Sequence, residues 1–381
     1  MSALKKVYII AGEASGDRLG AQAMAELKAA YPDVQFFGIG GPMMSEQGLE
    51  SLFPMEELSI MGFIEIAPNL ISILKRIKQT IQNIEEINPD LILTIDSPDF
   101  CFRVAKGVHK NGKTNAKLVH YVAPTVWAWR EGRAKKIAGF LDGILCLLPF
   151  EPSYFEKEGL KANFVGHPVM QSGILNADGS VFREEAGIAQ NEKTLGVFLG
   201  SRRAEIKRLG PVIRDALFEL ADEREKLHLI VPTLPHLKDQ VFKCLKDYPG
   251  PLHITVRPDL KWHAFKACDA AIAVSGTVGL ELAIANVPHL IAFNMTPMTW
   301  EIVKRVVKVR HAHLANILMD DDVVPEFIQP NCKVNLIAEK AHELLNDSAM
   351  QDQQRSHFQT VRDKISPQSK TAISDFVDEI L

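Results

Sequence analysis

Short apolar runs alternate with amphipathic stretches along the whole chain. Five runs in the first half predict strands, at 7–11, 35–39, 91–95, 117–122 and 143–147. Residues 19–31 keep an apolar stripe at helical spacing, and the same spacing continues through Leu70, Ile73, Leu74, Ile77, Ile81 and Ile84. Strands that alternate with helices indicate a parallel sheet with helical crossovers.

The second half repeats this alternation. Strands are predicted at 194–199, 227–231, 253–256, 270–274 and 289–292, and a helix at 210–221. The pattern predicts an α/β protein of two doubly wound, Rossmann-like domains, 1–167 and 168–345, joined at Val165-Gly166-His167-Pro168. A helix in 346–381 is expected to pack back on the first domain, although the pattern also allows the second.

Composition narrows the class of protein. The chain has 381 residues, which is long for a single core, and a formal net charge of −4, which argues against a nucleic-acid partner. Its five cysteines are scattered without CxxC spacing, so we predict no metal, no disulfide framework and a reducing, cytoplasmic setting. The first apolar run is too short for a secretory signal, and no stretch approaches the ~20 apolar residues of a spanning helix.

The segment 268–281 is the part of the sequence that most clearly indicates a ligand-binding site. Its buried run 270–274 ends at Ser275-Gly276-Thr277, and a helix is predicted to begin there. A helix start beyond a strand's carboxyl end gathers free amides that suit a phosphate, and Glu281 lies one turn further, within reach of a ribose diol. The alternative is an ordinary strand–turn–helix unit.

Three further loops follow predicted strands. Gly12-Glu13-Ala14-Ser15-Gly16-Asp17 is either an acceptor-facing loop or a plain capped turn, and it lacks the GxGxxG pattern of a dinucleotide site. Asp96 follows the run 91–95 and is either a general base or part of a turn before Pro98. Trp127, Trp129 and Arg130 either stack on a sugar or plug the edge of the sheet.

A fourth loop, Gly200-Ser201-Arg202, opens the second domain as 12–17 opens the first. Arg202 could neutralise a diphosphate bidentately and without a metal. The alternative is that Arg202 and Arg203 are an ordinary pair of surface arginines.

These motifs, taken in order, resemble the lipid-A-disaccharide synthases of Gram-negative bacteria. The resemblance spans nearly the whole chain and includes 12–17, Met61-Gly62-Phe63-Ile64-Glu65, 95–100, 126–130, Leu148-Pro149-Phe150-Glu151, 164–167, 200–202, 275–277 with Glu281, and 324–329. It implies a GT-B fold, with the two domains facing a cleft. It also implies an inverting glycosyltransferase that joins UDP-2,3-diacylglucosamine to 2,3-diacylglucosamine 1-phosphate (lipid X), giving a β-1,6 disaccharide 1-phosphate and UDP.

The resemblance also implies roles for particular residues. Asp96 and Arg202 would be catalytic. The residues expected to bind UDP are Gly200, Ser201, Arg202, Ser275, Gly276, Thr277, Glu281 and Asn316, and those expected to bind the acceptor are Gly12, Glu13, Ser15, Glu65 and Trp127. One departure is Leu314-Ala315-Asn316, where the family usually has Leu-Pro-Asn, which leaves the placement of Asn316 open.

Two segments predict contact with an anionic membrane surface. Met61, Phe63 and Ile64 form an apolar run, and Lys304 and Arg305 lie in a segment that mixes aliphatic and basic side chains. On pattern alone both could instead be core helices with solvated basic faces. We therefore expect a peripheral protein on the cytoplasmic face of the inner membrane, with a homodimer left open. Another UDP-GlcNAc-using GT-B enzyme, or a nonenzymatic lipid-binding relative, is the alternative function.

Overall fold

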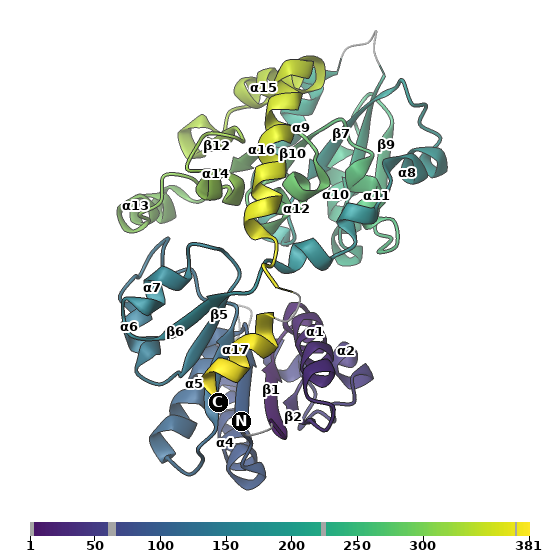
Figure 1. The fold of residues 1–381 in the computed structure, drawn as a ribbon. Helices are drawn as coiled ribbons and strands as arrows, with labels where there is room; N and C mark the ends of the chain where they lie inside the picture. The colour runs from purple at the N-terminus through teal and green to yellow at the C-terminus, as the bar shows by residue number, and fades with distance from the viewer. Residues whose placement is uncertain (1–3, 60–65, 222–225, 370–371) are drawn as a thin grey trace. The chain divides into compact units, whose positions relative to one another are not determined.

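A computed structural model describes residues 4–59, 66–221, 226–369 and 372–381. The chain divides into two compact units, Met1–Pro168 with Pro367–Leu381, and Val169–Ser366 (Figure 1). Each unit has its own six-stranded sheet, and every strand pair is parallel. The α/β prediction with two parallel sheets is therefore confirmed.

The sheet of the first unit has the strand order β2-β1-β3-β4-β5-β6. Its strands are β1 (Lys6–Ala11), β2 (Gln35–Ile39), β3 (Leu91–Ile95), β4 (Lys117–Tyr121), β5 (Gly143–Cys146) and β6 (Lys161–Phe164). The helices are α1 (Ala14–Ala30), α2 (Pro42–Glu46), α3 (Glu56–Ser59), α4 (Ile66–Ile87), α5 (Pro98–Asn111), α6 (Arg133–Ala138), α7 (Pro152–Glu156) and α17 (Ala372–Ile380).

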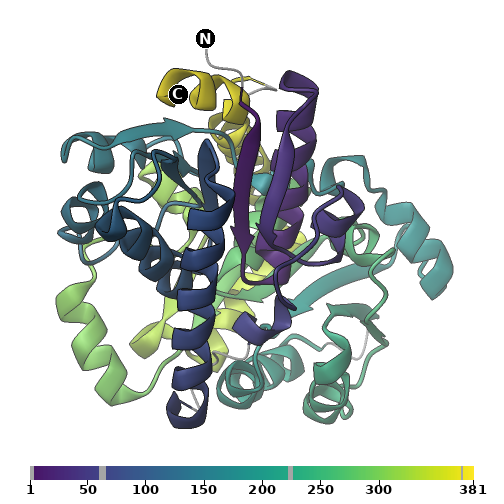
Figure 2. The same cartoon turned by 90° about the horizontal axis from the view of Figure 1, so that it is seen from below.

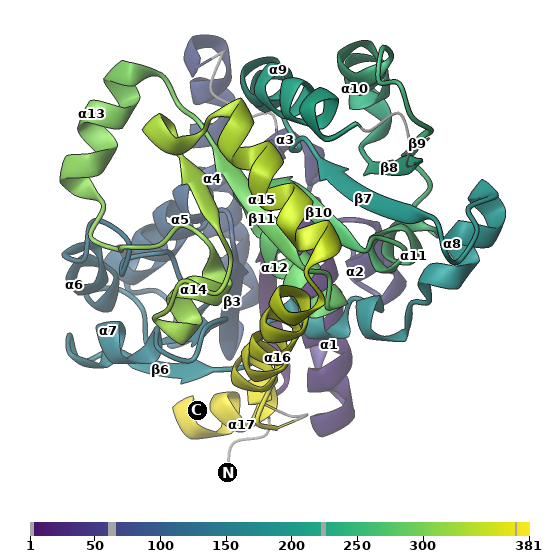
Figure 3. The ribbon, with the colours of Figure 1, turned by 90° about the horizontal axis from the view of Figure 1, so that it is seen from above.

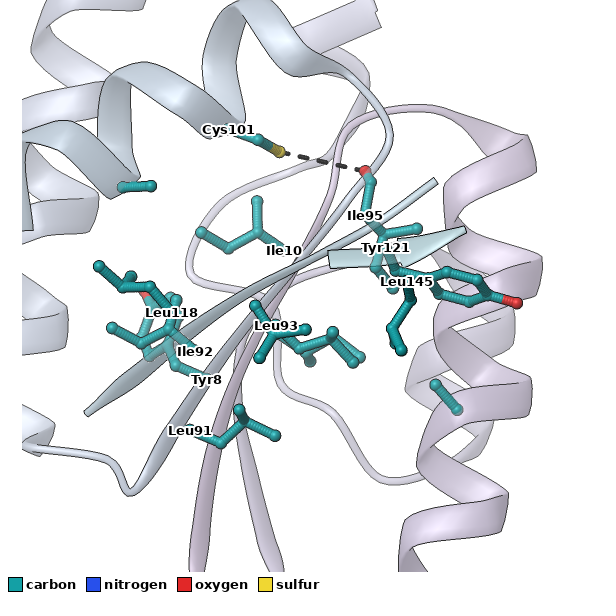
Figure 4. Packing of buried hydrophobic residues seen from close by; sticks show 14 of the residues in the cluster. Tyr8, Ile10, Leu91, Ile92, Leu93, Ile95, Cys101, Leu118, Tyr121 and Leu145 are labelled. Carbon is teal, nitrogen blue, oxygen red and sulfur yellow. Dashed lines mark hydrogen bonds between the residues drawn. The ribbon is translucent and has the colours of Figure 1, made fainter. Parts of the chain in front are cut away.

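The apolar strands of the first unit are buried from both faces. β1 and β3 carry unbroken runs of buried side chains, as crossover helices on both faces require (Figure 4). Figure 2 shows α1 running alongside β1. The helix α1 begins at Ala14, five residues before the predicted start, so Gly16 and Asp17 lie inside it. The Asp17 carboxylate caps nothing there and instead accepts hydrogen bonds from the amides of Gly41, Met43 and Met44.

The sheet of the second unit has the strand order β12-β11-β10-β7-β8-β9 (Figure 3). Its strands are β7 (Lys193–Phe198), β8 (Leu227–Pro232), β9 (Leu252–Thr255), β10 (Ala270–Val274), β11 (His289–Phe293) and β12 (Glu326–Ile328). The helices are α8 (Gly179–Ala186), α9 (Arg203–Leu220), α10 (Lys238–Leu245), α11 (Lys261–Lys266), α12 (Thr277–Ala285), α13 (Pro297–Val306), α14 (Leu314–Met319), α15 (Val334–Asn346) and α16 (Ser348–Ile365).

The C-terminal segment 346–381 is not one helix. α16 lies within the second unit, where Arg362 donates to the carbonyl of Ile284 and Lys364 to that of Leu318. Only α17 lies in the first unit, on α1, where the carboxylate of Glu26 accepts hydrogen bonds from the amides of Ile373 and Ser374. The chain thus crosses between the units a second time at Ser366-Pro367. The second unit therefore extends beyond the predicted boundary at residue 345.

Candidate active site

Both sheets contain one point where the strand order reverses direction. In the second unit β7 is followed by β8 and β9 on one side, whereas β10 begins the other side. Phe198 pairs with Ala273 in this register, so the loops that leave β7 and β10 lie next to each other. Ligands of open α/β sheets bind at such a switch point, beyond the carboxyl ends of the strands.

A pocket of about 420 Å³ occupies this switch point. It is lined by seven of the residues expected to bind UDP, Gly200, Ser201, Arg202, Ser275, Gly276, Thr277 and Glu281. The remaining lining residues are Phe198, Leu199, Glu205, Pro232, Thr233, Leu234, Lys261, Phe265, Val274 and Val278. Two segments about 75 residues apart in sequence therefore contribute to one cavity.

The start of α12 has no side-chain cap among the described residues. Gly276 adopts a φ of 154°, a backbone conformation that side chains disfavour. In the described part of the chain, no group accepts a hydrogen bond from the amides of Thr277 or Val278. Free amides and the positive end of the helix dipole make this the electropositive end of the pocket.

The start of α9 differs from the expectation, because its amides already have an acceptor. The Glu205 carboxylate accepts hydrogen bonds from the amides of Ser201 (2.9 Å) and Arg202 (3.2 Å) and from Arg202 Nη1 (3.2 Å). With the Glu205 carboxylate on the Arg202 amide, α9 starts at Arg203, seven residues before the predicted start, and the helix runs on through Pro211. The side chain of Arg202 is 80% exposed, so its guanidinium can turn toward a ligand.

Lys261 is a pocket residue that sequence reasoning missed. Its Nζ lies 3.0 Å from Glu281 Oε1 and 3.8 Å from the centre of the Trp262 ring. The ion pair orients the Glu281 carboxylate at the wall of the pocket. The adjacent Lys261-Trp262 pair at the start of α11 could have been noticed, but only the tertiary structure brings it next to α12.

Asn316 does not line the pocket. Its side chain is fully buried, donates to the carbonyl of Val324 and to Glu326, and accepts from the amide of Val324. The structure also accounts for Ala315 at the position of the family's proline. The Ala315 amide donates to His313 Nδ1 at 3.0 Å, which a proline could not do. Asn316 therefore fixes the segment that follows α14, and the structure gives it no surface for a nucleotide.

The switch point of the first unit lies between β1 and β3. Ala11 pairs with Ile95, which places the loop after β1 beside Asp96. A Cβ atom at Gly12 would lie 2.6 Å from Ser97 Oγ, so this close approach requires a glycine. Glu13 and Ser15 are exposed at the same edge of the sheet.

Asp96 adopts an unusual backbone conformation. Its φ is 50° and that of Ser97 is 41°, so two consecutive residues other than glycine lie in the left-handed region. Such strain is common where a side chain must point in a functional direction. The carboxylate is half-buried, and among the described residues no side chain donates a hydrogen bond to it. It is therefore able to accept a proton from a ligand.

Trp127 is placed differently from a sugar-stacking residue. Its side chain is buried, its Nε1 donates to Glu151 Oε1 at 3.0 Å, and its ring meets Phe150 edge to face. Glu151 also accepts from the amides of Leu147 and Leu148, and burial raises the pKa of its carboxyl to about 7. These contacts match the alternative interpretation of the sequence, in which Trp127 covers the edge of the sheet and does not stack on a sugar.

Replacing Trp127 by Phe should therefore affect stability more than substrate binding. The change removes the side-chain donor to a buried carboxyl, and we expect a loss of about 1–3 kcal/mol in the free energy of unfolding, measured by urea denaturation. The KM for the acceptor should stay within about twofold of the wild type. A large rise in that KM with unchanged stability would instead assign Trp127 to the acceptor site.

Part of the predicted membrane surface lies outside the described residues, namely Met61, Phe63 and Ile64, together with Glu65 of the acceptor set.

In the second unit α13 has no buried residue, and Met298, Ile302 and Val306 are exposed along it. The core-helix alternative therefore does not hold for α13. Lys304 and Arg305 both pair with Glu301. Among the described helices, none is both long and apolar enough to span a bilayer.

The titratable side chains of the described ranges offer no metal site. No three His, Cys, Asp or Glu side chains there converge on one point. The five cysteines are free thiols, and all but Cys244 are buried.

Comparisons with known proteins agree with this architecture. A family model described as lipid-A-disaccharide synthetase matches residues 7–380. The lipid-A-disaccharide synthase of Rhodospirillum centenum is 47% identical over 91% of this chain and 87% of that protein. The enzyme of the same name from Gluconobacter oxydans is 40% identical over 98% of this chain and 90% of its own length.

Solved structures share the fold at low identity. A Staphylococcus aureus MnaA complex with UDP superposes with a TM-score of 0.65 at 14% identity, covering 99% of this chain and 96% of that one. MurG of Acinetobacter baumannii gives a TM-score of 0.59 at 15% identity, covering 99% of each chain. The fold is thus GT-B, and the full-length family match and the close relatives show that this chain belongs to the lipid-A-disaccharide synthase family.

Proposed function

We propose that this protein transfers 2,3-diacylglucosamine from its UDP derivative to the 6-hydroxyl of 2,3-diacylglucosamine 1-phosphate. The products would be a β-1,6-linked disaccharide 1-phosphate and UDP. The observation that carries the proposal is the pocket at the switch point of the second unit, where an uncapped helix start, an exposed arginine and a carboxylate line one cavity. These are the groups that a nucleoside diphosphate needs.

The diphosphate would bind at the start of α12. The amides of Thr277 and Val278 would donate to its oxygens, and Arg202 would leave Glu205 to add a charged contact. Glu281, oriented by Lys261, would accept hydrogen bonds from the ribose hydroxyls. Because these donors stabilise charge that develops on the leaving UDP, they lower the barrier to breaking the bond between the sugar and the phosphate.

Asp96 would act as the general base. The acceptor oxygen attacks the anomeric carbon, the carboxylate takes its proton, and the electron pair of the broken bond leaves with UDP. Proton transfer of this kind contributes about 10²–10⁴-fold to a rate, and it requires the carboxylate within hydrogen-bond reach of the hydroxyl. Attack from the face opposite the leaving group gives inversion and hence the β linkage.

The direct experiment combines UDP-2,3-diacylglucosamine with the phosphorylated acceptor and follows the release of UDP and the mass of the product. We expect both products in equal amounts. Release of UDP without the disaccharide would favour another UDP-sugar enzyme of the same fold, and binding without any turnover would favour a nonenzymatic relative.

We further propose that the protein works on the cytoplasmic face of the inner membrane, where α13 contacts the anionic surface. Met298, Ile302 and Val306 recur at intervals of four residues, so they share one exposed stripe of the helix. Lys304 and Arg305 in its last turn would meet lipid phosphates. Ile302→Asp should therefore reduce sedimentation with phosphatidylglycerol vesicles, and unchanged sedimentation would refute this role of α13.

A further inference from the structure

A basic groove lies between α5 and α6 in the first unit. Its volume is about 220 Å³, and four cationic side chains line it, Arg103 and Lys106 from α5 and Arg133 and Lys136 from α6. The other lining residues are Pro98, Asp99, Phe102, Ile137 and Phe140. No step of the transfer described above uses this groove.

The four cations are not neutralised by the protein. Asp99 is the single acidic residue in the lining, and within the described ranges none of the four cations forms an ion pair. By contrast, Arg76 in the same unit pairs with Glu57 at 2.7 Å. Four like charges around one concave surface repel each other, and an anion bound among them would relieve that repulsion.

Two of the cations are held by aromatic rings. The guanidinium carbon of Arg133 lies 5.4 Å from the centre of the Phe102 ring, and Lys106 Nζ lies 5.1 Å from that of Phe140. The two rings are buried and meet edge to face at 5.7 Å. The rings form a rigid floor that positions the charges without cancelling them, so less conformational entropy is lost when an anion binds.

The groove adjoins the proposed general base along the chain. Pro98 and Asp99, which line it, lie two and three residues after Asp96. Consecutive Cα atoms are 3.8 Å apart, so the Cα of Pro98 lies within about 7.6 Å of that of Asp96. An anion in this groove would therefore belong to the substrate that Asp96 deprotonates, whereas the donor's phosphates have their own site on α12.

We propose that the groove between α5 and α6 binds the phosphate monoester of the acceptor glycolipid. This inference rests on the proposed function and adds a specificity site to it. Arg103 and Arg133 can each offer two parallel N–H groups to phosphate oxygens, and the two lysines add charge. The groove would make the enzyme choose a phosphorylated acceptor over the neutral glycolipid.

The test compares two double variants that remove the same charge from the same helices. Lys106→Gln with Lys136→Gln removes two groove cations, whereas Lys110→Gln with Lys135→Gln removes two exposed lysines that do not line the groove. Equilibrium binding of the acceptor in detergent, with and without its phosphate, gives four dissociation constants to compare with the wild type. We expect the groove variant to bind the phosphorylated acceptor about tenfold or more weakly, with the control variant unchanged.

Neither variant should change binding of the dephosphorylated acceptor, and KM for the UDP-sugar should stay constant. An equal loss for both forms of the acceptor, together with weaker sedimentation on phosphatidylglycerol vesicles, would overturn the proposal in favour of a membrane headgroup site. If the groove variant binds the phosphorylated acceptor as tightly as the wild type does, the groove proposal is refuted, whereas the proposed transfer reaction is not affected. If the wild type neither binds the acceptor nor releases UDP, the proposed function fails and the inference fails with it.

Discussion

Asp96→Asn is expected to lower kcat by about 10²–10⁴-fold, because asparagine cannot accept the proton of the attacking hydroxyl. The substitution is nearly isosteric and the carboxylate has no hydrogen-bond donor among the described side chains, so folding should be unaffected. Affinity for UDP should also be unchanged, since the pocket that would bind it belongs to the second unit. Steady-state kinetics and UDP titration of the purified variant check both results.

A matched control is Asp33→Asn, which removes an exposed carboxylate from a loop of the first unit. Its kcat and KM should equal those of the wild type. Wild-type turnover in Asp96→Asn would show that another group takes the proton. Loss of UDP affinity alongside the loss of kcat would mean that Asp96 acts on the donor rather than on the acceptor.

Arg183→Met is expected to lower the free energy of unfolding of the second unit by about 3 kcal/mol. The guanidinium is buried on α8, where it donates to both oxygens of Asp269, to Thr194 Oγ1 and to the carbonyl of Ala267. Thr194 lies on β7 and Asp269 immediately precedes β10, so this one side chain joins the two strands whose ends form the pocket. Methionine fills part of the volume but donates no hydrogen bond, so Asp269 keeps only its donors on Thr194 and the carbonyl of Ala267 keeps only the Thr194 hydroxyl.

The measurement is urea unfolding followed by circular dichroism, with UDP affinity determined in parallel. Arg214→Met provides the control, because Arg214 is half-exposed and pairs only with its neighbour Asp215 among the described residues. That variant should lose less than about 1 kcal/mol. If Arg183→Met also lost less than 1 kcal/mol, the buried network would not be what joins β7 to β10.

Most strands could be predicted because the interior of a parallel sheet is apolar on both faces. The runs at 91–95 and 270–274 are entirely buried and read as unbroken hydrophobic segments. The two missed strands, β6 and β12, are edge strands of four and three residues whose side chains are mostly half-buried. Both mix polar and apolar residues over too short a length to show a period, although the edge strands β2 and β9 were predicted.

In the candidate site, too, some residues could be predicted from the sequence and others could not. The loop after β10 was predicted because turn residues after a buried strand predict a helix start whatever the neighbours are. The loop after β7 was predicted from its Gly-Ser-Arg residues, without the helix that begins at Arg203. Glu205 and Lys261 were missed because their roles depend on contacts, one with the amides of the loop before α9 and one with a carboxylate on another helix. Asn316 was assigned from the resemblance and Trp127 from its place in a loop after a strand, and neither shows whether a side chain points outward or into the core.

By itself, the amino-acid sequence determined that two parallel α/β sheets form and that polar loops follow their strands, because burial and turn chemistry are local properties of the chain. Tertiary structure decided which loops meet. Strand order places 200–202 beside 275–277 and Gly12 beside Ser97, and it gathers four cations of α5 and α6 around one groove. Strand order depends on how the crossovers pack, a property of the whole sheet that no local pattern of residues contains.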